Sequence, residues 1–245
     1  MTVMFPYAAE NPLKEEFFGH SRRGYFVDVG ANDPERWSQS FHLEQMGWDG
    51  IVVEPQPQLA ELLRQRRKAK VYAVACSGPE NAGQQMTLYL AGIHSSFDPM
   101  LKTAAVRPQG TAQVPLETLD AILAESGSPT PIDLVAIDVE GHEIEVLRGF
   151  DFARWRPRLV LVEDLVLDLR LHRFMLARGY RWMRRTDINS WYVPAADAPR
   201  LDLAERWQFV RKYYLGTPAR RLREVLRRLR ARLRGARLAD AVRGH

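Results

Sequence analysis

The chain has 245 residues, 46% of them apolar, which is enough to bury a full hydrophobic core in one domain. Its single cysteine excludes a disulfide framework and favours a reducing compartment. No apolar stretch approaches the ~20 residues of a membrane span, and the N-terminus lacks the basic start and apolar run of a signal peptide. We therefore expect a soluble, cytoplasmic protein.

The net charge of +5 is unevenly distributed along the chain. Residues 211–245 hold twelve Lys or Arg against two acids, so this tail carries +10 and residues 1–210 carry −5. We therefore expect an acidic folded domain, residues 1–210, and a basic tail, residues 211–245.

Five short apolar runs rich in Val and Ile predict strands of a parallel sheet that is buried on both faces. Stretches with apolar residues at helical spacing alternate with them, which predicts a doubly wound α/β fold. An inserted β segment is expected between the third and fourth runs, and a hairpin late in the chain. The predicted strands are residues 24–30, 50–55, 70–78, 133–141 and 158–165; the helices 38–47, 57–67, 115–126 and 143–155; the insertion 85–116; and the hairpin 179–195.

Acids stand where these strands end, at Asp28, Glu54, Asp138 and Glu163. A parallel sheet binds its ligands beyond the carboxyl ends of its strands. Glu54 lies 24 residues after Gly30, which is about one βαβ unit, and an acid at that distance can bind both ribose hydroxyls. The sequence therefore predicts a nucleoside site.

The loop after the first strand, "GANDPE", does not suit a pyrophosphate. Two glycines of a dinucleotide loop are missing, Asp33 and Glu35 would repel a dianion, and Pro34 has no amide proton. S-adenosylmethionine fits better, because it has a ribose and two positive groups but no phosphate. An NAD-dependent enzyme is correspondingly disfavoured.

The series "FVDVGAN", "GWDGIVVEP", "HSS", "VPLETLD", "IDLVAIDVEGHEIEVLRG" and "RPRLVLVE" closely resembles the FkbM family of S-adenosylmethionine-dependent methyltransferases. The match extends in order from about residue 24 to residue 164. The resemblance implies a class I methyltransferase (Rossmann-like) fold, with a mostly parallel seven-stranded sheet that ends in an antiparallel strand. It also implies O-methylation, often of sugars in polysaccharides, glycolipids or natural products.

The resemblance also implies the cofactor site. Glu54 resembles the acid that binds the ribose, residues 75–77 resemble the strand end beside the adenine, and Asp138 the acid that closes the site. One departure is "ANDP", where many members have a second glycine. The expected cofactor-binding residues are Asp28, Gly30, Ala31, Asn32, Glu54, Pro55, Cys76, Ser77 and Asp138.

Methyl transfer to a hydroxyl needs an aligned acceptor and a group that removes its proton. Candidates for this chemistry are His94, Asp138, Glu140 and His142. His142 could instead merely open the next helix, and His94 could be a solvated loop residue. Asp138, Glu140 and Glu163 could alternatively hold a divalent metal, although we do not expect one to be required.

The basic tail has apolar residues near helical spacing with arginines between them, typical of a cationic amphipathic helix. We expect residues 218–240 to dock on the inner face of a membrane or on a partner enzyme; a helix packed on the body is the alternative. The apolar residues are Leu222, Val225, Leu226, Leu229, Leu233 and Leu238.

The sequence as a whole predicts an S-adenosylmethionine-dependent O-methyltransferase that releases S-adenosylhomocysteine and acts on a hydroxyl of a carbohydrate, glycolipid or polysaccharide precursor. One alternative is an RNA-directed methyltransferase anchored by the basic tail, although the acidic body argues against nucleic acid. Another is a non-catalytic scaffold that binds membranes or partners and retains the fold.

Overall fold

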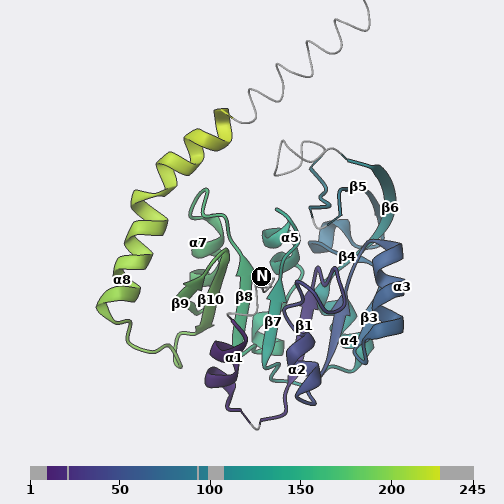
Figure 1. Cartoon of the computed structure of the whole chain (residues 1–245), viewed down its shortest axis with the longest axis horizontal. Helices are drawn as coiled ribbons and strands as arrows, with labels where there is room; N and C mark the ends of the chain where they lie inside the picture. The colour runs from purple at the N-terminus through teal and green to yellow at the C-terminus, as the bar shows by residue number, and fades with distance from the viewer. Residues whose placement is uncertain (1–9, 21, 93, 99–107, 227–245) are drawn as a thin grey trace, which may run out of the picture.

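The computed structural model describes residues 10–20, 22–92, 94–98 and 108–226. Its centre is a seven-stranded sheet with the order β3-β2-β1-β7-β8-β10-β9 (Figure 1). The first five of these strands are parallel, and β10 runs antiparallel to both of its neighbours. The doubly wound, mostly parallel sheet expected from the sequence is confirmed. The strands are β1 (Tyr25–Val29), β2 (Asp49–Val53), β3 (Lys70–Tyr72), β7 (Leu134–Ile137), β8 (Leu159–Glu163), β9 (Tyr180–Thr186) and β10 (Asn189–Pro194).

Helices cover both faces of the sheet, which explains why its strands read as continuous apolar runs. Along β1, Phe26 packs toward one helical layer and Val27 toward the other, as the alternation of a strand requires. The first layer holds α1 (Asn11–Phe18), α2 (Phe41–Gln45) and α3 (Pro57–Arg66); the second holds α4 (Leu119–Ser126), α5 (Glu143–Arg148), α6 (Phe152–Trp155) and α7 (Arg170–Ala177).

The inserted β segment forms a second sheet, and it corrects one predicted strand. Residues 70–78 do not make a single strand: β3 ends at Tyr72, and β4 (Ala75–Cys76) leaves the central sheet to pair with β6 (Gly110–Glu117). A turn of 3₁₀ helix, η2 (Pro79–Asn81), follows β4, and β5 (Gln85–Leu90) pairs antiparallel with β6. The pairing partner of β4 therefore comes from the insertion, which fixes that strand end outside the main sheet.

The predicted helix over residues 143–155 is also divided, into α5 and α6. A Cβ on Gly149 would lie 2.2 Å from the carbonyl oxygen of Ser77, so the chain approaches β4 too closely here for a larger residue. The carboxylate of Asp151 then accepts hydrogen bonds from the amides of Ala153 and Arg154 and starts α6. The break thus has both a steric and a capping cause.

The last described segment is helical and runs along the outer side of the molecule, past α7 and β9 (yellow-green in Figure 1). It comprises α8 (Leu203–Phe209), a π-turn η3 (Val210–Leu215) and helical residues 217–226. The expected boundary between residues 210 and 211 falls inside this segment, and Tyr213 is buried in the core. Residues 227–245, which include most of the predicted docking tail, lie outside the described residues. No helix in the described part is long and apolar enough to cross a bilayer.

Candidate functional site

A pocket opens at the carboxyl ends of β1, β2 and β7, where the fold brings together loops that are distant in sequence. We call it the strand-end pocket. It is walled by β4, by β5 of the insertion and by residues that follow β5. Its lining residues are Val29, Gly30, Asn32, Val53, Glu54, Pro55, Gln56, Val74, Ala75, Cys76, Leu88, Ser95, Phe97, Asp138, Val139, Glu140 and His142.

Gly30 lets the ends of β1 and β7 approach each other at the base of this pocket. A Cβ at Gly30 would lie 1.9 Å from the carbonyl oxygen of Asp138, and the glycine has a φ of 85°, which disfavours any other residue. The amide of Asp138 donates to the carbonyl of Val29 at 2.9 Å. The glycine is therefore required by backbone contact as well as by backbone conformation.

Asn32 occupies the departure from the family pattern. Its φ is 51°, in the left-handed region that glycine and asparagine tolerate best. Its amide donates to Glu54 Oε2 at 2.9 Å, and the amide of Gln56 donates to Glu54 Oε1, also at 2.9 Å. Asn32 can thus adopt the backbone conformation that a glycine would have here, and its amide keeps the loop hydrogen-bonded to Glu54 at the end of β2.

Glu54 is the buried acid of the pocket, with 2% of its surface exposed. Burial raises the pKa of this carboxyl to about 7, although the hydrogen bonds from Gln56 and Asn32 oppose the shift. Each carboxylate oxygen accepts one backbone hydrogen bond and retains capacity for another. The group can therefore accept hydrogen bonds from a pair of vicinal hydroxyls.

Cys76 also lines the pocket, but its chemistry there is passive. Burial raises the pKa of its thiol far above the usual range, so the group stays neutral and acts as a small apolar wall.

The structure places three of the expected cofactor residues outside the pocket lining. Asp28 lies one position before the end of β1, so its side chain turns to the opposite face of the sheet, where it accepts a 2.5 Å hydrogen bond from Ser40 Oγ. Ala31 is buried in the core on that same face. Ser77 lies behind the pocket, hydrogen-bonded to His142. Gly30, Asn32, Glu54, Pro55, Cys76 and Asp138 are brought together as expected.

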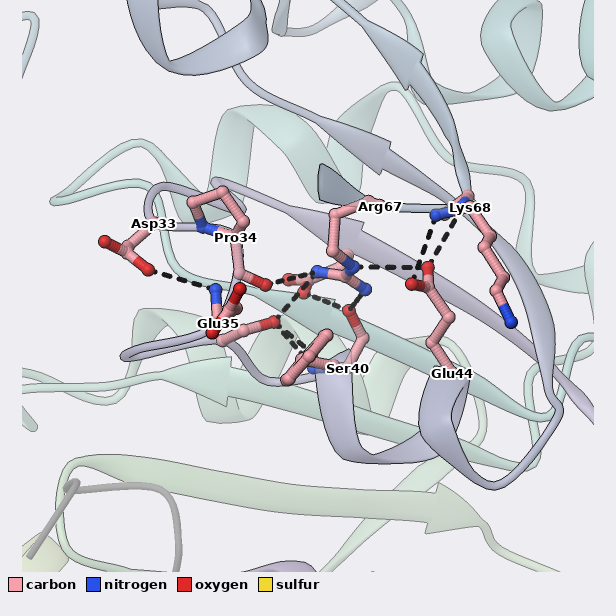
Figure 2. Close-up of polar contacts among 11 residues, drawn as sticks. Asp33, Pro34, Glu35, Ser40, Glu44, Arg67 and Lys68 are labelled. Carbon is pink, nitrogen blue, oxygen red and sulfur yellow. Dashed lines mark hydrogen bonds and ion pairs between the residues drawn. The ribbon is translucent and has the colours of Figure 1, made fainter. Parts of the chain in front are cut away.

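Arg67 ties the loop after β1 to the neighbouring helices (Figure 2). Its side chain is fully buried; it pairs with Glu44 at 3.2 Å and donates to the carbonyl of Pro34 and to Ser40 Oγ. Glu44 in turn accepts from the amides of Lys68 and Ala69. The course of the unusual "ANDP" loop is thus held by a charged, hydrogen-bonded anchor that follows α3.

The donor set of the strand-end pocket fits S-adenosylmethionine. Within the described residues its lining contains no Lys or Arg, so a phosphate would meet no cation. It offers instead the Glu54 carboxylate for a ribose, apolar side chains such as Val74 and Leu88 for a base, and the acids Asp138 and Glu140 for positive groups. These are the chemical features by which this nucleoside differs from a dinucleotide.

A second cavity adjoins the first, and we call it the acidic pocket. It shares Phe97, Glu140 and His142 with the strand-end pocket. Among the described residues, eight acidic side chains and one arginine, Arg170, contribute to its wall. These acids are Asp98, Glu140, Glu143, Glu145, Glu163, Asp164, Asp168 and Glu224.

The two candidate histidines take different positions. His142 lies at the junction of both pockets, its Nε2 is 3.2 Å from Ser77 Oγ, and its ring lies beside that of Phe97. Burial lowers the pKa of His142, which keeps the ring neutral near pH 7. His94 lines neither pocket directly; its Nδ1 lies 3.3 Å from Glu140 Oε1. Both histidines therefore meet the carboxylate-rich junction, but only His142 faces both cavities.

Three carboxylates converge at the same junction. Ligand oxygens of Asp138, Glu140 and Glu163 lie within 4.8 Å of one another, a separation that a divalent cation could bridge. Glu140 also has a φ of 53°, an uncommon conformation for a residue other than glycine. The loop after β7 is thus shaped so that its acids converge at the pocket junction.

Several pocket residues were not predicted from the sequence. Gln56 accepts a 3.1 Å hydrogen bond from Ser95 Oγ and so closes the insertion over the pocket. Phe97 forms part of both cavities, and Glu224 reaches the acidic pocket from the C-terminal helical segment. The "HSS" motif of the insertion was the sequence signal for the contact with Gln56. Glu224 gave no such signal, because it lies far along the chain from the rest of the site.

The order of the sheet and a nucleoside pocket at its strand ends define a class I methyltransferase. Residues 28–182 match the family model for the methyltransferase FkbM domain. This match spans more than half of the chain, so the protein belongs to the FkbM methyltransferase family. It is a methyl-transferring enzyme family that uses S-adenosylmethionine.

Solved structures with a related fold are distant in sequence. PH1948 from Pyrococcus horikoshii, a proposed RNA methyltransferase, is 11% identical with a TM-score of 0.41, covering 78% of this chain and 83% of its own. The N-terminal domain of human METTL16, in complex with S-adenosylhomocysteine, is 13% identical with a TM-score of 0.40, covering 79% and 70%. Likenesses this weak carry no argument about the acceptor. Among curated proteins, none matches the chain.

Proposed function

We propose that this enzyme transfers a methyl group to a hydroxyl of a carbohydrate or glycoconjugate acceptor. S-adenosylmethionine supplies a methyl group activated by its sulfonium. Glu54 would hold the ribose, the loop of Gly30 and Asn32 the methionine part, and Asp138 the positive groups. The acceptor would occupy the acidic pocket.

The observation that carries this proposal is the composition of the acidic pocket. Its described lining has an excess of acids, even though Asp168 and Glu145 are paired with arginines. A nucleic acid needs a basic surface instead. Carboxylates accept hydrogen bonds from hydroxyl groups, and a neutral polyol offers many of these. The pocket chemistry thus favours a sugar over RNA as acceptor.

We assign the general base to His142. Its place at the junction of the two pockets is the position from which a group can take a proton from an acceptor hydroxyl as the new carbon–oxygen bond forms. The lowered pKa of this imidazole keeps it unprotonated near neutral pH. If its Nε2–H donates to Ser77, its Nδ1 is left free to accept the proton. Glu140 would accept a hydrogen bond from the same acceptor and orient it.

The test compares two histidine variants in the full chain, using acceptors from sugar, amino-sugar and RNA classes with S-adenosylmethionine. His142→Gln should reduce turnover by about 10²–10⁴-fold and leave the affinity for S-adenosylhomocysteine within about threefold. His94→Gln is the matched control and should retain most activity. Mass spectrometry and NMR of the product locate the methyl group.

Methylation of RNA but of no sugar would refute the acceptor assignment. Tight S-adenosylhomocysteine binding without turnover on any acceptor class would instead support a non-catalytic scaffold. A larger loss of turnover in His94→Gln than in His142→Gln would identify His94, in the insertion, as the general base.

A further inference from the structure

The exposed large apolar side chains of the described residues are concentrated on the C-terminal helical segment, residues 203–226. Leu203 is 84% exposed and Trp207 is 59% exposed, although both belong to a regular helix. Only two other large apolar residues in the described part are comparably open. We call the following set the apolar stripe: Leu203, Trp207, Val210, Tyr214, Leu215, Leu222, Val225 and Leu226.

The stripe keeps to one side of the segment because of the π-turn. Before and within that turn, Leu203, Trp207, Val210 and Tyr214 follow the four-three-four spacing of a single helix face. The spacing resumes one residue later, from Leu215 through residues 219, 222 and 226. The additional residue of the π-turn η3 (Val210–Leu215) resets the register, as such bulges do.

The opposite face of the segment is fixed to the body. Tyr213 is 1% exposed, stacks on Phe209 at 4.6 Å between ring centroids, and donates to Asp164 Oδ2 at 3.0 Å. Thr217 Oγ1 donates to the carbonyl of Val166 at 3.3 Å. Since these contacts hold the inner face, the apolar stripe points outward over most of its length, while Tyr214 borders a cavity shared with Arg173 of α7.

The two acids of the segment lie on its inner face, although Arg220 also turns inward and donates to the carbonyl of Val166 at 3.0 Å. The acids turn toward the body: Glu205 pairs with Arg184 at 3.6 Å, and Glu224 lines the acidic pocket. Exposed arginines flank the apolar stripe; they are Arg206, Arg211, Arg221 and Arg223. The outward surface is therefore apolar along its middle and basic at its margins.

We propose that this outward surface docks on an anionic lipid bilayer, with the helix lying in the plane of the interface. A cationic amphipathic helix of this kind binds through its apolar face and through attraction to anionic headgroups. Trp207 and Tyr214 are aromatic types favoured at such interfaces. Pairing with a second copy is disfavoured, because it would bring two sets of like-charged arginines together. The segment is roughly 36 Å long at 1.5 Å per residue. The docking proposal holds whichever acceptor the enzyme methylates.

The test is cosedimentation of the full chain with vesicles of phosphatidylcholine, with and without phosphatidylglycerol, at low and high salt. We expect binding only to the anionic vesicles, weakening with salt. Trp207→Ser/Leu222→Ser should weaken it about tenfold or more. Arg211→Gln/Arg223→Gln should weaken it about thirtyfold, at ~1 kcal/mol per charge. Ala204→Ser, an exposed change outside the stripe, is the matched control and should bind like wild type.

Circular dichroism and S-adenosylhomocysteine affinity, unchanged in all variants, show that the fold is intact. Equal binding to neutral and anionic vesicles, or undiminished binding by the Trp207→Ser/Leu222→Ser variant, would overturn the proposal. The proposal would also be overturned if the wild-type protein bound no vesicles but formed a dimer in solution, and if the Trp207→Ser/Leu222→Ser variant were monomeric. The stripe would then be a subunit interface.

Discussion

At the scale of single residues, Glu54 connects the protonation of the site to cofactor binding. Its pKa is raised from 4.5 to about 7 by burial, so between these values the folded protein keeps a proton that the unfolded chain releases. This group's contribution to stability is therefore present in full at low pH and lost as the pH rises through about 7. Binding a ribose through the carboxylate has the opposite dependence, because the proton must first leave.

We accordingly expect S-adenosylhomocysteine affinity to fall as the pH drops below about 7, by at most about tenfold per pH unit. Calorimetric titration between about pH 5.5 and 8 measures this. Glu54→Gln should bind more weakly and lose this pH dependence. A variant that keeps the wild-type pH profile would show that another group titrates.

Arg67 supplies the second prediction at this scale. Because Arg67 and Glu44 are both buried, Arg67→Met leaves a carboxylate without its cation, a change that typically costs about 3–5 kcal/mol. We expect a strongly lowered unfolding midpoint in denaturant. Arg67→Met/Glu44→Gln should recover part of the loss, since no uncompensated charge remains. A double variant less stable than Arg67→Met would argue that the anchor acts mainly through the Pro34 carbonyl and Ser40.

At the scale of elements, the contact between the ends of β1 and β7 decides the shape of the strand-end pocket. Gly30→Ala would place a methyl group against the Asp138 carbonyl and require a left-handed alanine, which is strained. The strand ends must separate, so we expect S-adenosylhomocysteine affinity to fall at least about tenfold, with a smaller change in stability. Gly83→Ala, also at positive φ but with open space around it, is the control for strain alone. Equal affinities for the two variants would show that the close contact is unimportant.

The elements of the central sheet could be predicted because burial on both faces imprints continuous apolar runs on the sequence. The side of the sheet that Asp28 faces could not, since a one-residue shift in where a strand ends reverses every side chain. The separation of β4 from β3 also escaped prediction, because its partner β6 lies about forty residues further along the chain. Contacts between distant segments leave no local periodicity.

The residues of the candidate site likewise fall into those that the sequence predicted and those that it did not. Glu54 and the acids after β7 were found because strand ends meet at one edge. The roles of Gln56, Phe97 and Glu224 depend on how the insertion and the C-terminal helical segment fold back over that edge. These are tertiary facts that no spacing in the sequence encodes.

At the scale of the whole molecule, the C-terminal helical segment separates an acidic pocket from an apolar, arginine-flanked surface. The acidic pocket lies on its inner side and the arginine-flanked apolar stripe on its outer side. A membrane that attracts the outer side would repel the acidic body, so both interactions favour one orientation. If the proposed docking holds, the basic segment and the acidic body would both favour the same orientation of the enzyme at the bilayer.

This arrangement has a consequence for how an acceptor arrives. Glu224 and Leu222 lie within one helical turn, yet the first lines the acidic pocket and the second belongs to the apolar stripe. Only the thickness of a helix, about 10–12 Å, separates that wall of the pocket from the proposed lipid surface. A sugar carried on a lipid could then enter while its anchor stays in the bilayer. The encounter rate would follow the lateral diffusion and surface density of the acceptor rather than its bulk concentration.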